Sequence, residues 1–135
     1  MTVGENVKLI ERHYEAFYRG DMEGLIEPFD PGIVFVEEPD VRPDAGTHVG
    51  IEGMRTFFEA MFDGSQEVAV DPLEWIDHGD KVIVEIRLHG RFRHTGIAGE
   101  ARFVHVWTFH DGRVTHLRMY TNKEAALADL GLPPG

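Results

Sequence analysis

The chain has 135 residues, of which 42% are hydrophobic and 27% are charged, and this balance predicts one globular domain over residues 1–135. Thirteen Lys and Arg against 24 Asp and Glu give a net charge of −11, which argues against nucleic acid and anionic membranes as partners. The absence of cysteine excludes thiolate nucleophiles and Cys-based metal sites. No segment has the apolar length of a signal peptide or a membrane span, so we expect a cytoplasmic protein.

The first half of the chain predicts three helices and one strand. Apolar residues at helical spacing between Val7 and Tyr18 indicate a first helix that ends at Gly20, and Asp21 caps a short second helix. Pro28 breaks that second helix. The elements expected next are a strand over 33–38, a loop over 40–50 and an apolar helix over 51–62.

The second half changes to period-two spacing, which is typical of strands. Strands are expected over 67–70, 73–76, 81–93, 101–110 and 113–121, followed by a short helix over 123–130. The turns at 78–80 and 110–112 join neighbouring strands into antiparallel hairpins. Helices followed by strands predict an α+β fold, in which a curved antiparallel sheet wraps around the N-terminal helices to form a cone with an apolar cavity.

The strand over 101–110 alternates between an aromatic face and a mixed face. Phe103, His105 and Trp107 lie on the aromatic face, which we interpret as a wall of the cavity. Burial there disfavours the charged form of the His105 ring. A core histidine whose two nitrogens are satisfied by neighbours is the structural alternative.

The strand over 81–93 also divides into two faces. Ordinary patterning buries Val82 and the residues in step with it, and it leaves Glu85, Arg87 and His89 to solvent or to a partner subunit. In the alternative orientation these three polar residues enter the cavity.

Two adjacent carboxylates, Glu37 and Glu38, end the strand over 33–38 just before Pro39. They point to opposite sides of the strand, so at most one can enter the cavity, where an apolar environment raises a carboxyl pKa and suits a general base. The alternative is a carboxylate at the rim that pairs with Arg42, Arg55 or another surface charge.

Two tyrosines of the first helix, Tyr14 and Tyr18, are expected on its buried face, where their hydroxyls could reach a ligand or merely pack, and His13 borders that face. Apolar lining of a substrate site is expected from Tyr18, Phe35, Phe58, Phe62, Phe103, Trp107 and Met119.

Known cofactor motifs are missing from the sequence. The eight histidines form neither a His-x-His pair nor an HExxH motif, so no metal site is expected. The chain also lacks a phosphate-binding loop, a G-x-S-x-G elbow and a dinucleotide fingerprint, and no cofactor is expected.

The order of these elements resembles the nuclear transport factor 2-like superfamily, in particular its SnoaL-like and ketosteroid-isomerase-like members. The likeness is carried by YEAFYRGDMEGL at 14–25, EEP at 37–39, GIEGMRTFF at 50–58, FVHVWTFHDGRV at 103–114 and YTNKEAALADLG at 120–131. The resemblance extends over nearly the whole chain and implies the cone fold, but the same fold is used by isomerases, cyclases, dehydratases, epoxide hydrolases and binding modules.

The resemblance to ketosteroid isomerase implies that Glu38 is the catalytic base, which assigns Glu37 to the outside. It also puts His13 near that family's oxyanion tyrosine and His105 near its protonated aspartate, so both oxyanion positions differ in residue type. The carboxylate of SnoaL-type cyclases has no match at Thr121 and Asn122.

The epoxide-hydrolase-like members use an Asp-Arg-Asp arrangement to activate water. Asp40, Arg87 and Glu85 could imitate it only if the strand over 81–93 turned its polar face inward.

These observations lead to the hypothesis of a cofactor-independent isomerase, cyclase or dehydratase that acts on a hydrophobic carbonyl compound. Glu38 would transfer the proton, and His105, helped by His13 or Tyr14, would donate a hydrogen bond to the enolate oxygen. The alternatives are a binding protein for a hydrophobic ligand, epoxide-hydrolase-like water activation and an assembly subunit. The resemblance also implies a homodimer through the outer sheet face, with Arg118 and Tyr120 in the contact.

Overall fold

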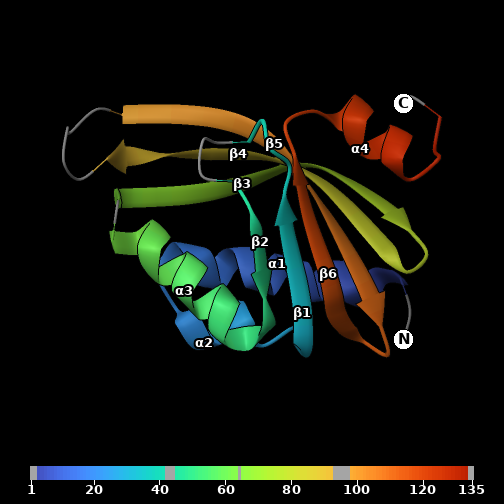
Figure 1. The fold of residues 1–135 in the computed structure, drawn as a ribbon, viewed down its shortest axis with the longest axis horizontal. Coiled ribbons are helices and arrows are strands. Elements are labelled where there is room, and N and C mark those ends of the chain that lie inside the picture. Colours follow the sequence, from blue (N-terminus) through green and yellow to red (C-terminus); the bar gives the residue numbers. More distant parts are fainter. Residues whose placement is uncertain (1–2, 42–44, 64, 93–97, 134–135) are drawn as a thin grey trace.

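The computed structural model describes residues 3–41, 45–63, 65–92 and 98–133. In chain order, the elements are α1 (Val3–Arg19), α2 (Met22–Ile26), β1 (Phe29–Glu37), β2 (Thr47–Val49), α3 (Gly50–Asp63), β3 (Ser65–His78), β4 (Lys81–Phe92), β5 (Ala98–His110), β6 (Arg113–Tyr120) and α4 (Lys123–Asp129). Figure 1 shows a curved, unclosed sheet with α1, α2 and α3 on one side and α4 on the other.

The described strands form one sheet in the order β2-β1-β6-β5-β4-β3. Neighbouring strands are antiparallel except β1 and β6, which pair in parallel. The expected α+β fold with helices packed on a curved sheet is confirmed, whereas the expectation of a wholly antiparallel sheet is wrong for this one pair. A parallel pair requires a long connection, and the chain between β1 and β6 contains most of the domain.

The face of the sheet toward α1 and α3, called the inner face here, carries the main core. Ile10 and Phe17 of α1 and Met54 of α3 pack there against Val82, Val84 and other inward residues of the strands. The opposite, outer face carries a smaller apolar cluster, in which Ala126 and Leu127 of α4 cover residues that include Ile83, Val104 and Val106.

Local sequence signals set several of the element boundaries. Gly20 adopts φ 64°, a left-handed conformation that glycine takes without steric cost, and α1 ends just before it. The side chain of Asp21 accepts a hydrogen bond from the Gly24 amide and caps α2 as predicted. Asp111 and Gly112 both have positive φ and form the tight turn between β5 and β6, also as predicted.

Two strands differ from the sequence-based expectation. Residues 47–49 form the short strand β2 inside what was expected to be a loop, and they pair with β1. The two expected strands over 67–76 are one strand, β3, with an irregular register at Pro72 and Glu74. Proline has no amide hydrogen to donate to a neighbouring strand, so Pro72 interrupts the strand pattern in the sequence. In the structure β3 nevertheless continues past Pro72 and stays paired with β4.

Candidate active site

Five residues on the inner face stand in one row across five strands. The register pairs Trp75 with Val84, Val84 with His105, His105 with Met119, and Met119 with Glu37. Adjacent strands lie about 4.8 Å apart, so the backbones at Glu37 and His105 are separated by about 10 Å. A carboxylate and an imidazole thus project from the same face on either side of Met119.

Glu37 is the buried carboxylate of the inner face. It is only 4% exposed, and its Oε1 accepts a hydrogen bond from Nε2 of His48 at 3.0 Å. The His48 ring is itself held by Phe35, at 5.5 Å between ring centroids, and by Phe57, at 4.9 Å. A buried carboxylate that orients an imidazole is an arrangement able to accept and return a proton.

Glu38, which was expected to point inward, lies on the outer side. Its side chain is 30% exposed and pairs with Nε of Arg118 at 3.4 Å. The inward residues of β1 are Ile33, Phe35 and Glu37, so strand alternation turns Glu38 outward. The expected orientation of the two carboxylates is therefore wrong. The position of Glu37, two residues after the apolar Phe35 and thus on the same face, was the signal in the sequence that could have corrected it.

Glu38 fits the alternative of a rim carboxylate, because it pairs with a surface charge, Arg118. Arg55 instead donates to Glu23 at 2.9 Å and approaches Glu52, and Arg42 lies outside the described residues.

His48 was not predicted as a site residue, because its strand is too short to show an alternating pattern in the sequence.

Tyr14 and Trp107 contact His105 on the inner face. The Tyr14 hydroxyl lies 2.9 Å from Nδ1 of His105, and the indole Nε1 of Trp107 donates to the same hydroxyl at 3.1 Å. The rings of Tyr14 and His105 are nearly parallel at 5.9 Å. The structure therefore brings into contact three residues that the sequence analysis expected at the site.

His13 lies deeper in the core than expected. It is 4% exposed, and its Nδ1 donates to the carbonyl oxygen of Leu25 at 2.9 Å. Its ring contacts the ring of Trp107 at 4.9 Å and those of Phe29 and Phe58 at 5.7 and 5.9 Å. His13 thus ties α1 to α2 within an aromatic cluster.

Burial sets the ionisation of these groups. It lowers the pKa of His13 from 6.5 to about 4, against the opposing effect of the bond to Leu25. It also lowers the pKa of His105 to about 3, with a smaller contribution from the nearby His13. The pKa of Tyr14 is raised by burial despite the bond from Trp107. Both imidazoles are therefore neutral near pH 7, and the phenol keeps its proton.

The expected apolar lining residues differ in how much surface they expose. Trp107 is fully buried, and Phe35, Phe58 and Met119 are nearly so, whereas Phe62 and Phe103 keep part of their surface accessible. Tyr18 is 53% exposed, which contradicts the expectation that it lies on the buried face of α1. Each helical residue turns by about 100°, and one step beyond the buried Phe17 carries Tyr18 past the edge of the stripe.

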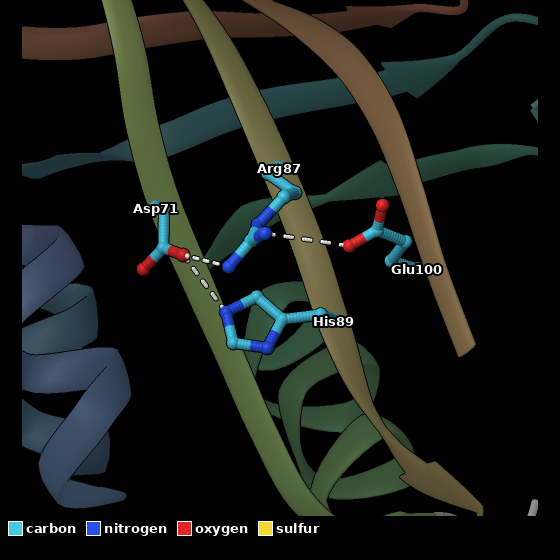
Figure 2. Close-up of polar contacts among 4 residues, drawn as sticks. All are labelled: Asp71, Arg87, His89 and Glu100. Carbon is cyan, nitrogen blue, oxygen red and sulfur yellow. Dashed lines mark hydrogen bonds and ion pairs between the residues drawn. The ribbon is translucent and has the colours of Figure 1, made fainter. Parts of the chain in front are cut away.

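The orientation expected for the strand over 81–93 is confirmed for β4, whose described part ends at Phe92; Arg93 lies outside the described residues. Val82 and Val84 belong to the inner core, and Arg87 and His89 lie on the outer face. Figure 2 shows Arg87 between two carboxylates, with Nη2 at 3.1 Å from Asp71 and Nη1 at 3.4 Å from Glu100. His89 donates to the same Asp71 oxygen at 2.8 Å.

This outer cluster bears on the epoxide-hydrolase-like alternative. An acid-Arg-acid arrangement does exist, but on the outer face and from Asp71, Arg87 and Glu100, with the arginine side chain 38% exposed. Asp40, one of the residues expected to form it, instead accepts a hydrogen bond from Thr121 at 2.8 Å. A water-activating site enclosed by the inner face is not formed by these residues.

Tyr120 was expected in a subunit contact, but α4 covers it. Tyr120 is 4% exposed, and its hydroxyl donates to Asp129 of α4 at 2.7 Å. Arg118 is exposed beside it and pairs with both Glu38 and Asp129. The part of the outer face near Tyr120 is therefore occupied by the chain's own C-terminal helix.

Two broader features concern the described residues only. They contain no group of three or more His, Asp or Glu side chains arranged to hold a metal ion. None of their helices has the length and apolar character needed to cross a bilayer.

Comparison with known proteins extends the resemblance drawn from the sequence. A solved structure of an NTF2-like protein from Burkholderia thailandensis is 26% identical and superimposes with a TM-score of 0.77, covering 95% of this chain and 98% of that chain. TerC, crystallised with polyporic acid, is 25% identical with a TM-score of 0.77 and covers 93% of this chain and 97% of that one.

A third structure, from Jannaschia sp. and called a SnoaL-like polyketide cyclase, is 23% identical with a TM-score of 0.76. It covers 97% of this chain and 94% of that chain, and at this identity it supports the fold alone. No curated protein matches the chain. The sequence profile of the SnoaL-like domain matches residues 10–117, which is most of the chain. With the cone fold and this match, the chain belongs to the SnoaL-like domain family.

Proposed function

We propose that the protein is a cofactor-independent enzyme that moves a proton next to the carbonyl group of an apolar small molecule, as in an isomerisation, cyclisation or dehydration. The observation that carries the proposal is the buried Glu37 carboxylate bonded to His48, in the same inner-face row as His105. The SnoaL-like family, and the similar protein TerC, which was crystallised with polyporic acid, support small-molecule chemistry.

The Glu37–His48 pair acts as the general base in this proposal. His48 donates from Nε2 to the carboxylate, so the buried carboxylate and the imidazole act together as the proton-accepting pair. General-base catalysis of this kind contributes about 10²- to 10⁴-fold to a rate.

His105 acts as the hydrogen-bond donor to the oxygen that becomes negative. Its Nδ1 is occupied by Tyr14, which leaves Nε2 for a substrate. The ring stays neutral near pH 7 because burial lowers its pKa to about 3, so it stabilises an enolate by hydrogen bonding without transferring a full charge. In this proposal the substrate lies above Met119, between the side chains of Glu37 and His105, whose backbones are about 10 Å apart.

Deuterium exchange tests this function without knowledge of the natural substrate. The protein is incubated in D2O with a panel of uncharged cyclic ketones and enones, and deuterium next to the carbonyl is measured by mass spectrometry. We expect exchange above the buffer rate for at least one compound and its loss in Glu37→Gln. Ligands that bind, with no exchange in any of them, would instead support the binding-protein alternative.

We also propose that two copies of the chain associate through the part of the outer face that α4 leaves uncovered. Asp71 and Glu100 are negative there and Arg87 is positive, so one patch can pair with its own two-fold copy. Sedimentation velocity at micromolar concentration should give the mass of a dimer, and Arg87→Glu should shift it toward the monomer. A wild-type monomer under these conditions would count against the proposal.

A further inference from the structure

We infer that Trp107 and Tyr14 are positioning residues that keep the single proton of His105 on Nε2, so that this ring can donate but not accept toward the inner face. The catalytic meaning of this inference rests on the proposed function. The proton assignment itself rests only on the contacts among these three side chains.

The first contact fixes the direction of the chain of hydrogen bonds. An indole N–H is a donor and never an acceptor. Its nitrogen in Trp107 lies 3.1 Å from the Tyr14 hydroxyl oxygen, so that oxygen must accept. Trp107 is completely buried, and its inner-face position is paired with Val82 and Leu117 on the neighbouring strands, which holds the indole in place.

The second contact follows from the hydroxyl proton of Tyr14. Tyr14 is 3% exposed, so its proton needs a protein acceptor. Among the described residues, the acceptor found within hydrogen-bond distance is Nδ1 of His105, at 2.9 Å. If Nδ1 of His105 carried a proton instead, two donors would face the Tyr14 oxygen and the phenol proton would be buried without a partner.

The third step concerns the histidine itself. A neutral imidazole carries one proton, and a ring that accepts at Nδ1 must carry it on Nε2. The ring cannot easily exchange its two nitrogens, because it is stacked on Tyr14 at 5.9 Å and meets Trp107 edge-on at 5.6 Å. The low pKa that burial gives His105 is consistent with a single neutral tautomer near pH 7.

This arrangement gives the indole of β5 and the phenol of α1 a polar role beside His105. Trp107 touches no solvent, and its N–H bonds the Tyr14 hydroxyl, which in turn bonds His105. Two buried donors in series also polarise one another, which strengthens the last hydrogen bond of the chain. His105 is thereby separated in role from the Glu37–His48 pair, which retains the proton-accepting groups.

Nitrogen NMR tests the inference directly. In wild-type protein labelled with ¹⁵N-histidine, long-range ¹H–¹⁵N correlation at pH 7 should show a protonated Nε2 and an unprotonated, hydrogen-bonded Nδ1 for His105. Tyr14→Phe should shift the Nδ1 resonance toward that of a free ring nitrogen. Tyr120→Phe is the matched control, because its hydroxyl bonds Asp129 on the other side of the sheet, and it should leave His105 unchanged.

The tryptophans offer a second matched pair. Trp107→Phe should weaken the hydrogen bond at Nδ1 and shift its resonance in the same direction as Tyr14→Phe. Trp75→Phe should not, because the contact of Trp75 with Tyr14 is between the two rings. A proton on Nδ1 of wild-type His105 would overturn the inference, and so would equal shifts from both tryptophan variants. The wild-type measurement decides the matter even if a core variant fails to fold.

The outcome is separable from that of the proposed function. Deuterium exchange by the wild-type protein together with a proton on Nδ1 would reject the positioning role and retain the enzyme. The expected Nε2 tautomer without exchange in any ketone would reject the enzyme and retain the hydrogen-bond chain.

Discussion

Acidification should destabilise the fold through its buried histidines, and His13 gives the clearest case. An unfolded histidine has a pKa near 6.5, whereas burial lowers the pKa of folded His13 to about 4. Between these values the unfolded chain binds more protons than the folded one, so stability must fall as the pH falls. The stabilising contribution is complete above pH 6.5 and is lost progressively on the way to pH 4.

The size of the effect follows from the same two values. At pH 5 the unfolded ring is almost fully protonated and folded His13 is only about one tenth protonated, which corresponds to a loss of about 2 kcal/mol relative to pH 7. This is a substantial part of the 5 to 15 kcal/mol that stabilises a typical domain. The ring is 4% exposed, so little solvent screening reduces the estimate.

The variant His13→Asn isolates this contribution. An asparagine amide can replace the Nδ1–H that donates to Leu25, but it does not titrate. The free energy of unfolding is measured by urea denaturation at pH 7, 6 and 5 for the wild type, for His13→Asn and for His116→Asn, whose histidine is exposed. We expect the loss between pH 7 and pH 5 to be about 2 kcal/mol smaller in His13→Asn than in the other two proteins.

Equal losses in all three proteins would refute the reasoning about burial at His13. If the asparagine variant is too unstable to compare, the ring of wild-type His13 can be titrated by NMR. A midpoint near pH 4 is expected, and a midpoint near 6.5 would be an equally clear contradiction.

Three further substitutions test the description of the fold. Tyr120→Phe removes the hydrogen bond to Asp129 and should lower the free energy of unfolding by about 1 kcal/mol in urea titration; no change would mean that this hydrogen bond does not help to hold α4. Asn122→Ala removes the side-chain cap that accepts from the Ala125 amide and should cost about 1 kcal/mol, read as faster amide hydrogen exchange in α4. Tyr18→Ser should change the thermal midpoint by less than about 2 °C, and a larger drop would indicate that this exposed ring is buried in solution.

The parts of the fold that depend on local signals could be predicted from the sequence. Glycine and aspartate marked the end of α1 and the start of α2, and alternation identified the inner and outer faces of β4 and β5. Parallel pairing of β1 with β6 could not be read in this way, since the two strands are about eighty residues apart in the chain. The three residues of β2 take strand form only through their bonds to β1.

The site was predictable to the same extent. Pairing of Tyr14 with His105 agrees with periodicity in the helix and alternation in the strand. The choice between the two adjacent carboxylates failed because it followed the family resemblance. Strand alternation puts Glu37, and not Glu38, on the same face as Phe35. His48 could not be found, because its position beside Glu37 is a consequence of the strand pairing.

The central claim is that Glu37, and not its neighbour Glu38, supplies the proton-accepting carboxylate. The most direct measurement compares the rates of deuterium exchange into a responsive ketone for the wild type, Glu37→Gln and Glu38→Gln. We expect Glu37→Gln to be slower by about 10²-fold or more and Glu38→Gln to stay within about twofold of the wild type, because Glu38 pairs with Arg118 on the outer face. A large loss in Glu38→Gln with full activity in Glu37→Gln would contradict the account.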